Sequence, residues 1–295
     1  MSAALVNRIV TLIRDTSSSL PPDVLNALKA AQRKEKRGSS AAVVLKTILD
    51  NCAIAKKRGT PLCQDTGTLT FFVDEGLRRR VTPAVIRKAV AIATERGYLR
   101  KNTIDAVTGR SYDDNCALGA PVIHYVSTPS SLIPHPSSLT LILKGGGSEN
   151  MSRQYSLPDA SLGAGRDLEG VRKCVLDAVQ KIQGYGCAPG ILGVAIGGDR
   201  ATGYEVAKEQ LLRPLDENRL LSTAADSCRS GKNLAALEKR LLREANSLGI
   251  GPMGLGGKTT LLGVKVAARP RVPASFFVTV AYMCWACRRR TLCVE

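Results

Sequence analysis

The stretch GTPLCQDTGTLTFFVD (59–74) marks a change in the character of the chain. Its second half, TLTFFVD (68–74), is rich in β-branched and aromatic residues, a composition that favours a strand. Its first half places a thiol, an amide, a carboxylate and a hydroxyl in the four residues 63–66. So many polar groups are unusual for a core, and the run is too compact for a tail. The stretch therefore predicts a loop suited to chemistry that leads directly into a strand.

The residues before this stretch favour helices. Apolar side chains recur at helical spacing from Leu5 to Ile13. Pro21 and Pro22 can begin a second helix. Ser39 or Ser40 can cap a third, which Gly59 would end. We therefore expect the first sixty residues or so to be helical.

The residues after it alternate between helix and strand patterns. A further helix should begin at Thr82-Pro83 and end at Gly97. Strands are expected at 139–143, 191–197, 261–268 and 276–282, and helices at about 168–183, 203–213 and 233–248. The segment 127–138, rich in serine and proline, predicts a surface loop or hairpin connection. Together these patterns predict an α+β (mixed α/β) fold with a mixed sheet flanked by helices. No clear linker or repeat appears, so we expect one domain over 1–295, with room for two lobes.

The composition narrows the class of protein. The net charge is +17, which raises nucleic-acid binding as an interpretation from a different class of function. However, the basic residues are scattered, and aromatic residues, which would stack on bases, make up only 4%. A solvated basic surface explains the charge better, so we expect no nucleic-acid partner. Arg8 and Arg14 interrupt the apolar start of the chain, so we also expect no membrane segment and a cytoplasmic location.

Two glycine-rich segments invite comparison with anion-binding loops. GPMGLGGKT (251–259) departs from a P-loop because Pro252 stands where a glycine is required and a strand pattern follows. In KGGGSEN (144–150), the three glycines Gly145, Gly146 and Gly147 follow a strand pattern. Their backbone N–H groups can approach an anion without obstruction by side chains. Taken alone, this segment is more typical of a flexible turn.

Nine cysteines, an odd number, suit metal binding or catalysis better than disulfides in a reducing compartment. Three of them follow helix or strand patterns in polar or glycine-rich loops: Cys63 in PLCQDTG, Cys187 in QGYGCAPG and Cys284 in AYMCWACRRR, which we place after the last strand. Their wide spacing matches neither zinc pairs nor a ferredoxin run. Cys284 and Cys287 form a C-x-x-C pair, but a thioredoxin-like pair should open a helix early in a βαβ unit.

The motifs PLCQDTG, LRKN, KGGGSEN, GYGCAPG and CWA occur in this order along nearly the whole chain. In this respect the chain resembles the alpha subunit of the class I fumarate hydratase and L-tartrate dehydratase family. The resemblance implies a [4Fe–4S] cluster held by Cys63, Cys187 and Cys284, with Cys287 as an alternative to Cys284. Three thiolates on a four-iron cube leave one iron open as a Lewis acid for a substrate carboxylate and hydroxyl.

The same resemblance implies roles for the polar residues. Arg100 would clamp a substrate carboxylate with its guanidinium fork, and Gln64 would donate an amide hydrogen bond. Asp65 would exchange a proton with the leaving hydroxyl, while Gly145, Gly146 and Gly147 would add backbone donors.

The base that removes the carbon-bound proton is not visible in this sequence. The resemblance places it on a separate beta subunit in an α2β2 assembly. The leading expectation is hydration of fumarate to (S)-malate. Dehydration of L-tartrate to oxaloacetate is the second.

Overall fold

The computed structural model describes residues 3–127, 135–216 and 228–294, with no description of side chains at 228–232. The chain divides into two compact units, each made of separate segments of the sequence. The first unit contains Met1–Pro22, Ile48–Gly146 and Ala286–Glu295, and the second contains Asp23–Thr47 and Gly147–Trp285. Within the described ranges, no helix is both long and apolar enough to cross a membrane.

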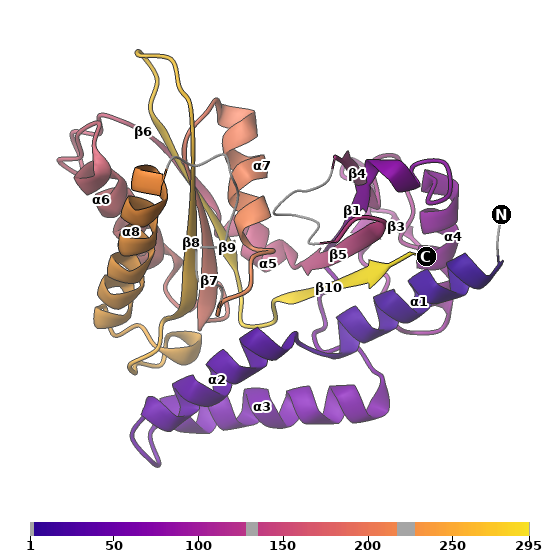
Figure 1. The fold of residues 1–295 in the computed structure, drawn as a ribbon. Coiled ribbons are helices and arrows are strands. Elements are labelled where there is room, and N and C mark those ends of the chain that lie inside the picture. The colour runs from indigo at the N-terminus through magenta and orange to yellow at the C-terminus, as the bar shows by residue number, and fades with distance from the viewer. Residues whose placement is uncertain (1–2, 128–134, 217–227, 295) are drawn as a thin grey trace. The chain divides into compact units, whose positions relative to one another are not determined.

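The first unit is built on a mixed sheet with the strand order β10–β5–β1–β4 (Figure 1). Its strands are β1 (Thr68–Asp74), β4 (Val122–Val126), β5 (Ser138–Lys144) and β10 (Arg288–Cys293). β1 pairs parallel with β4 and antiparallel with β5, and β5 pairs antiparallel with β10. The predicted strand at 68–74 is therefore confirmed as an interior strand.

Helices cover one face of this sheet. Alternate residues of β1, such as Phe71, pack with alternate residues of β5, such as Leu141, against Ile9 and Ile86. The helices of this unit are α1 (Ala3–Ser18) and α4 (Pro83–Glu95), with a 3₁₀ turn η1 (Glu75–Leu77) and a small hairpin of β2 (Thr103–Ile104) and β3 (Ser111–Tyr112). Thr82 caps α4, since its hydroxyl accepts a hydrogen bond from the N–H of Val85.

The second unit has its own mixed sheet, with the order β6–β9–β7–β8. Its elements are β6 (Arg153–Ser156), β7 (Gly190–Gly197), β8 (Leu261–Arg269), β9 (Phe277–Met283), α2 (Pro22–Lys34), α6 (Leu168–Ile182), α7 (Arg200–Gln210), α8 (Cys228–Ser247) and η3 (Pro252–Gly254). Figure 1 shows α6 and α8 on one side of this sheet and α7 on the other. The first residue of α2, Pro22, belongs to the first unit. Two further helices, α3 (Ser40–Arg58) and α5 (Gly146–Asn150), also run across a unit boundary in the sequence.

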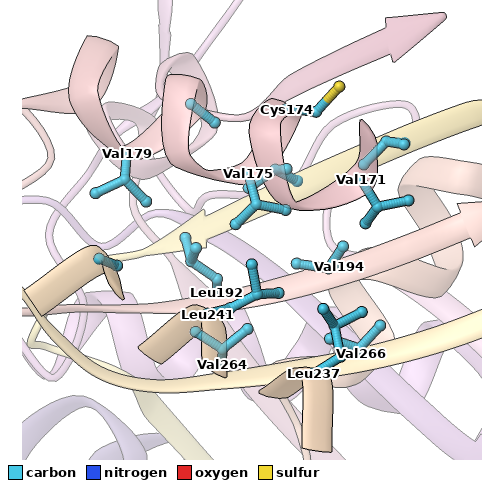
Figure 2. Close-up of a cluster of buried hydrophobic side chains, with 14 of the residues drawn as sticks. Val171, Cys174, Val175, Val179, Leu192, Val194, Leu237, Leu241, Val264 and Val266 are labelled. Atoms are coloured by element: carbon cyan, nitrogen blue, oxygen red, sulfur yellow. The ribbon is translucent and has the colours of Figure 1, made fainter. Parts of the chain in front are cut away.

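The core of the second unit lies between this sheet and the pair α6 and α8. Figure 2 shows Leu192 and Val194 of β7 facing Val175 of α6 and Leu241 of α8. All of these side chains are fully buried. The opposite face of β7 carries Gly193, whose lack of a side chain lets α7 approach closely.

Most predicted elements are confirmed with small shifts. The predicted helix at 203–213 begins earlier, at Arg200, because the Asp199 carboxylate caps it by accepting from the N–H groups of Ala201 and Thr202. Placing Cys284 after the last strand was wrong, because β10 follows it. That strand was missed because Arg288–Arg290 has the composition of a solvated surface. The mixed α and β class is confirmed, whereas the single domain over 1–295 stays a prediction. The expected loop at 127–138 lies largely outside the described residues.

Gly193 offers a direct test of the packing in the second unit. A Cβ atom at this position would lie 1.9 Å from the carbonyl oxygen of Ala207 on α7. We expect Gly193→Ala to lower the free energy of unfolding by about 1–3 kcal/mol, the usual cost of overpacking a core, or more because the obstacle is backbone. Urea denaturation measures this. Gly76→Ala is the control, since its nearest neighbouring atom would be 3.5 Å away, and equal midpoints for both variants would contradict the packing described.

Candidate active site and metal centre

Asp65 is the most highly connected polar side chain of the PLCQDTG loop. Its Oδ1 atom accepts hydrogen bonds from the Gly67 N–H at 2.8 Å and from Nδ2 of Asn102 at 2.8 Å. Its Oδ2 atom accepts from the Gly146 N–H at 2.7 Å. Three donors from three parts of the chain therefore hold the carboxylate in one orientation.

Strand pairing explains why these segments meet. Thr68, the first residue of β1, pairs with Lys144, the last residue of β5, so the loop before β1 and the glycines after β5 lie at the same end of the sheet. The approach is close: a Cβ atom on Gly67 would lie 2.4 Å from the carbonyl group of Lys144, and one on Gly145 would lie 2.9 Å from Oδ2 of Asp65. Glycine is required at both positions by this contact, and at Gly67 also by a φ of +76°.

Gln64 and Arg100, which were expected to act beside Asp65, are both exposed. Thr66 fixes the backbone of Arg100, since its hydroxyl accepts from the Arg100 N–H at 2.8 Å and donates to the Arg100 carbonyl at 3.0 Å. The side chains of Arg100 and Gln64 face solvent. The structure thus holds the backbone of Arg100 close in space to Asp65 and leaves its guanidinium accessible.

A cavity of about 240 Å³ lies beside Asp65 in the first unit. Its lining includes Asp65, Asn102, Thr103, Thr68 and Gly146. It is smaller than pockets for drug-sized ligands, yet a short dicarboxylate is smaller still. Asn102 was missed by the sequence analysis, although it belongs to the LRKN motif already singled out.

Arg288 was also missed. It is 1% exposed and lies in β10, and its Nη2 atom donates to the backbone carbonyl of Asp65 at 2.9 Å. A buried guanidinium directly behind the loop both braces Asp65 and places a positive charge near it. The solvated basic surface expected from the net charge therefore does not include Arg288.

Cys63 lies in the first unit and is partly exposed. Its sulfur accepts a hydrogen bond from the Asp65 N–H at 3.4 Å, and its thiol donates to Oε1 of Gln64 at 3.8 Å. The thiol is therefore accessible and lies next to the fixed carboxylate.

Cys187 and Cys284 both lie in the second unit, at one end of its sheet. β7 begins at Gly190 and its antiparallel partner β9 ends at Met283, so the residues before one strand and after the other are brought together. The Trp285 N–H donates to the Cys187 carbonyl at 3.3 Å. Cys187 is exposed with a φ of +55°, and Cys284 is partly exposed. Both are accessible thiols on a rigid framework.

The position of Cys287 differs from that of Cys284. Cys287 belongs to the first unit and is 0% exposed. The strand β10 follows it directly, so the C-x-x-C pair does not open a helix, which contradicts the thioredoxin-like interpretation. Within each unit, the described residues contain no group of three or more His, Cys, Asp or Glu side chains that could hold a metal ion. The three-cysteine ligand set therefore stays a prediction.

The GPMGLGGKT segment does not form a phosphate loop. The N–H groups of Lys258 and Thr259 donate to the Glu35 carboxylate of the same unit, and β8 follows instead of a helix. These donors are therefore already used by an internal anion, as the departure from the P-loop pattern indicated.

Burial separates other cysteines from these three. It raises the pKa of the Cys174 thiol to about 12 and that of Cys52 to about 11. Since the thiolate is the reactive form, the buried Cys174 thiol should be almost entirely unreactive at pH 8, whereas the Cys187 side chain is exposed.

We therefore expect iodoacetamide at pH 8 to label Cys187 in the folded, cluster-free chain and to leave Cys174 unlabelled. Peptide mass spectrometry after brief labelling measures both sites. Labelling in urea is the control, because both cysteines then react. Equal labelling of both in the folded chain would contradict the burial described.

These features define an α+β protein that presents accessible thiols and a fixed carboxylate at the ends of its strands. A model of the fumarate hydratase (Fumerase) family matches residues 6–293. The chain belongs to this family.

Three relatives are similar to this chain over most of its length. A putative fumarate hydratase class I from Geobacillus stearothermophilus is 46% identical over 290 residues, which cover 97% of this chain and 54% of that protein. The chain thus spans about half the length of this relative. A putative L(+)-tartrate dehydratase subunit alpha from Methanocaldococcus jannaschii is 34% identical, over 95% of this chain and 94% of the relative. The L(+)-tartrate dehydratase subunit alpha of Escherichia coli K12 is 29% identical, over 98% and 92%.

Proposed function

We propose that this protein is the cluster-binding part of a hydro-lyase that converts fumarate and water to (S)-malate. The observation that carries the proposal is the Asp65 carboxylate, held by three N–H donors beside a small cavity in a loop that also contains Cys63. Membership of the fumarate hydratase family supports the reaction class.

The proposed cofactor is a [4Fe–4S] cluster with Cys63, Cys187 and Cys284 as ligands. The residues fit such a group, because all three thiols are accessible and two of them lie at one end of a rigid sheet. The full burial of Cys287 supports Cys284 as the third ligand. When bound through three thiolates, the cluster supplies one open iron that acts as a Lewis acid.

The remaining roles belong to the residues around the cavity. Arg100, whose guanidinium is exposed, binds one substrate carboxylate, and Gln64 donates a hydrogen bond beside it. Asp65 exchanges a proton with the hydroxyl that leaves as water. Gly145, Gly146 and Gly147 line the substrate position with backbone groups, and the N–H of Gly146 acts by fixing the segment to Asp65. We add Asn102, which orients the Asp65 carboxylate and lines the cavity.

The base that takes the carbon-bound proton is not assigned to this chain, so a second polypeptide is needed to supply it. We propose a separate beta subunit and an α2β2 assembly. The relatives named as subunit alpha support this arrangement, since the chain covers 94% and 92% of their lengths. The same two names favour dehydration of L-tartrate as the second candidate reaction.

The test is anaerobic co-expression with the beta subunit, followed by an assay with fumarate, (S)-malate and both enantiomers of tartrate. Turnover of fumarate and (S)-malate supports the first reaction, and turnover of L-tartrate alone replaces it with the second. A complex that contains the cluster and turns over none of these substrates would overturn the proposal.

A further inference from the structure

Tyr282 carries a buried hydroxyl group that lacks a partner within the described residues. The side chain is 1% exposed, and its hydroxyl oxygen has no hydrogen-bond partner there. A hydroxyl removed from water without a replacement hydrogen bond costs free energy, whereas phenylalanine would fill the same space without that cost. The hydroxyl at this position therefore points to a partner that the described residues do not supply.

The loop around Cys187 is shaped to receive the end of this ring. A Cβ atom on Gly186 would lie 2.3 Å from Cε1 of Tyr282, and one on Gly190 would lie 2.3 Å from its hydroxyl oxygen. Neither glycine has a positive φ. Glycine is therefore required at both positions by the space that the phenol occupies and not by the backbone conformation.

The same end of the sheet carries Cys187 and Cys284, the two proposed cluster ligands of the second unit. Tyr282 lies in β9, and Cys284 directly follows Met283, the last residue of that strand. The N–H of Tyr282 donates to the hydroxyl of Ser152 at 3.3 Å, and that of Cys284 donates to the hydroxyl of Ser148 at 3.1 Å. Ser148 of α5 and Ser152 after it thus hold the segment in place.

A tyrosine hydroxyl can both donate and accept a hydrogen bond.

We propose that the Tyr282 hydroxyl donates a hydrogen bond to a sulfur atom of the cluster bound by Cys187 and Cys284, and thereby raises the reduction potential of that cluster. The inference rests on the proposed cofactor. Tyr282 is a positioning residue, because it acts through the cluster. The physical reason is that a hydrogen bond to a cluster sulfur stabilises the reduced form, which carries more negative charge.

The experiment compares Tyr282→Phe with the unchanged chain and with a matched control, Tyr155→Phe. Tyr155 lies in the same unit, but its hydroxyl donates to Oδ2 of Asp177 at 2.7 Å. The purified chains are reconstituted anaerobically, and the iron content and the reduction potential are measured. The urea midpoint of each cluster-free chain is measured separately.

We expect Tyr282→Phe to shift the equilibrium between oxidised and reduced cluster about tenfold toward the oxidised form, a potential about 59 mV lower for a one-electron couple. Its cluster-free form should unfold at the same or a higher urea concentration than the unchanged chain. Tyr155→Phe should behave in the opposite way, with a lower urea midpoint and an unchanged potential, because it loses a hydrogen bond within the protein.

An unchanged reduction potential in Tyr282→Phe at full iron content would overturn this inference and leave the proposed cofactor intact. So would a clear loss of cluster-free stability in that variant, since the hydroxyl would then have a partner in the chain. Loss of cluster uptake with intact cluster-free stability would support it. If the unchanged chain takes up no cluster at all, the proposed cofactor is overturned and this inference with it.

Discussion

Serine in place of Cys187 should prevent assembly of the cluster. Anaerobic reconstitution of the unchanged chain should give broad visible absorption and about four irons per chain, the content of a cubane cluster, and the variant should show neither. A serine hydroxyl is a poor substitute for a soft thiolate as an iron ligand. Because only three protein ligands are proposed, the loss of one removes a third of the bonds between protein and cluster. The same result is expected for Cys63→Ser and Cys284→Ser. Iron analysis and the visible spectrum of the reconstituted chains measure the effect.

Cys174→Ser is the matched control, because that thiol is fully buried in the core of the second unit. It should keep its cluster, although a polar atom in an apolar core lowers the stability of the fold. Cys287→Ser separates the two candidates for the third ligand. If this variant loses the cluster while Cys284→Ser retains it, then the third ligand is Cys287.

The chain assayed without its beta subunit should turn over fumarate at least ~10²–10⁴ times more slowly than the complete enzyme. The residues around the Asp65 cavity supply a carboxylate and hydrogen-bond donors, but we assign no base for the carbon-bound proton among them. A base must lie within hydrogen-bond reach of the proton it removes. Steady-state rates before and after addition of the partner measure the difference.

Substrate binding should be affected much less than turnover. Arg100, Asn102 and the segment 145–147 all belong to this chain, so (S)-malate should still bind to the cluster-loaded protein in a calorimetric titration. Arg100→Met is the variant that should weaken that binding, because it removes the only charge that we assign to a substrate carboxylate. Full turnover by the chain alone, free of contaminating partner, would contradict the division of labour between two subunits.

Local sequence patterns were sufficient for much of the fold. The strand at 68–74 and the helix that begins at Pro83 were predicted because aromatic and β-branched residues, or a threonine cap before a proline, act over a few neighbouring residues. The short helix α5 was not predicted, since three glycines have low helix propensity. The strand β10 was missed because its arginines indicate a surface, and only pairing with β5 makes the segment a strand.

Some residues of the candidate site were likewise predicted from local sequence, and others were not. The loop that holds Cys63 and Asp65 was found from sequence, because its unusual density of polar groups is a local property. The assignment of Cys63, Cys187 and Cys284 as ligands came from the resemblance of several motifs in order and still awaits the experiments above. Asn102 was within reach of the sequence analysis, whereas nothing local in an arginine run distinguishes Arg288 from its neighbours.

The sequence by itself determined the family, the mixed α and β class and the loops in which the chemistry is proposed, because each depends on motifs or on neighbouring residues. Only the tertiary structure decided that the Gly146 N–H meets Asp65 and that Gly186 and Gly190 make room for Tyr282. These contacts join residues far apart in the chain. They depend on which strands pair and in which register, and a shift by one residue would turn the side chains to the other face of the sheet.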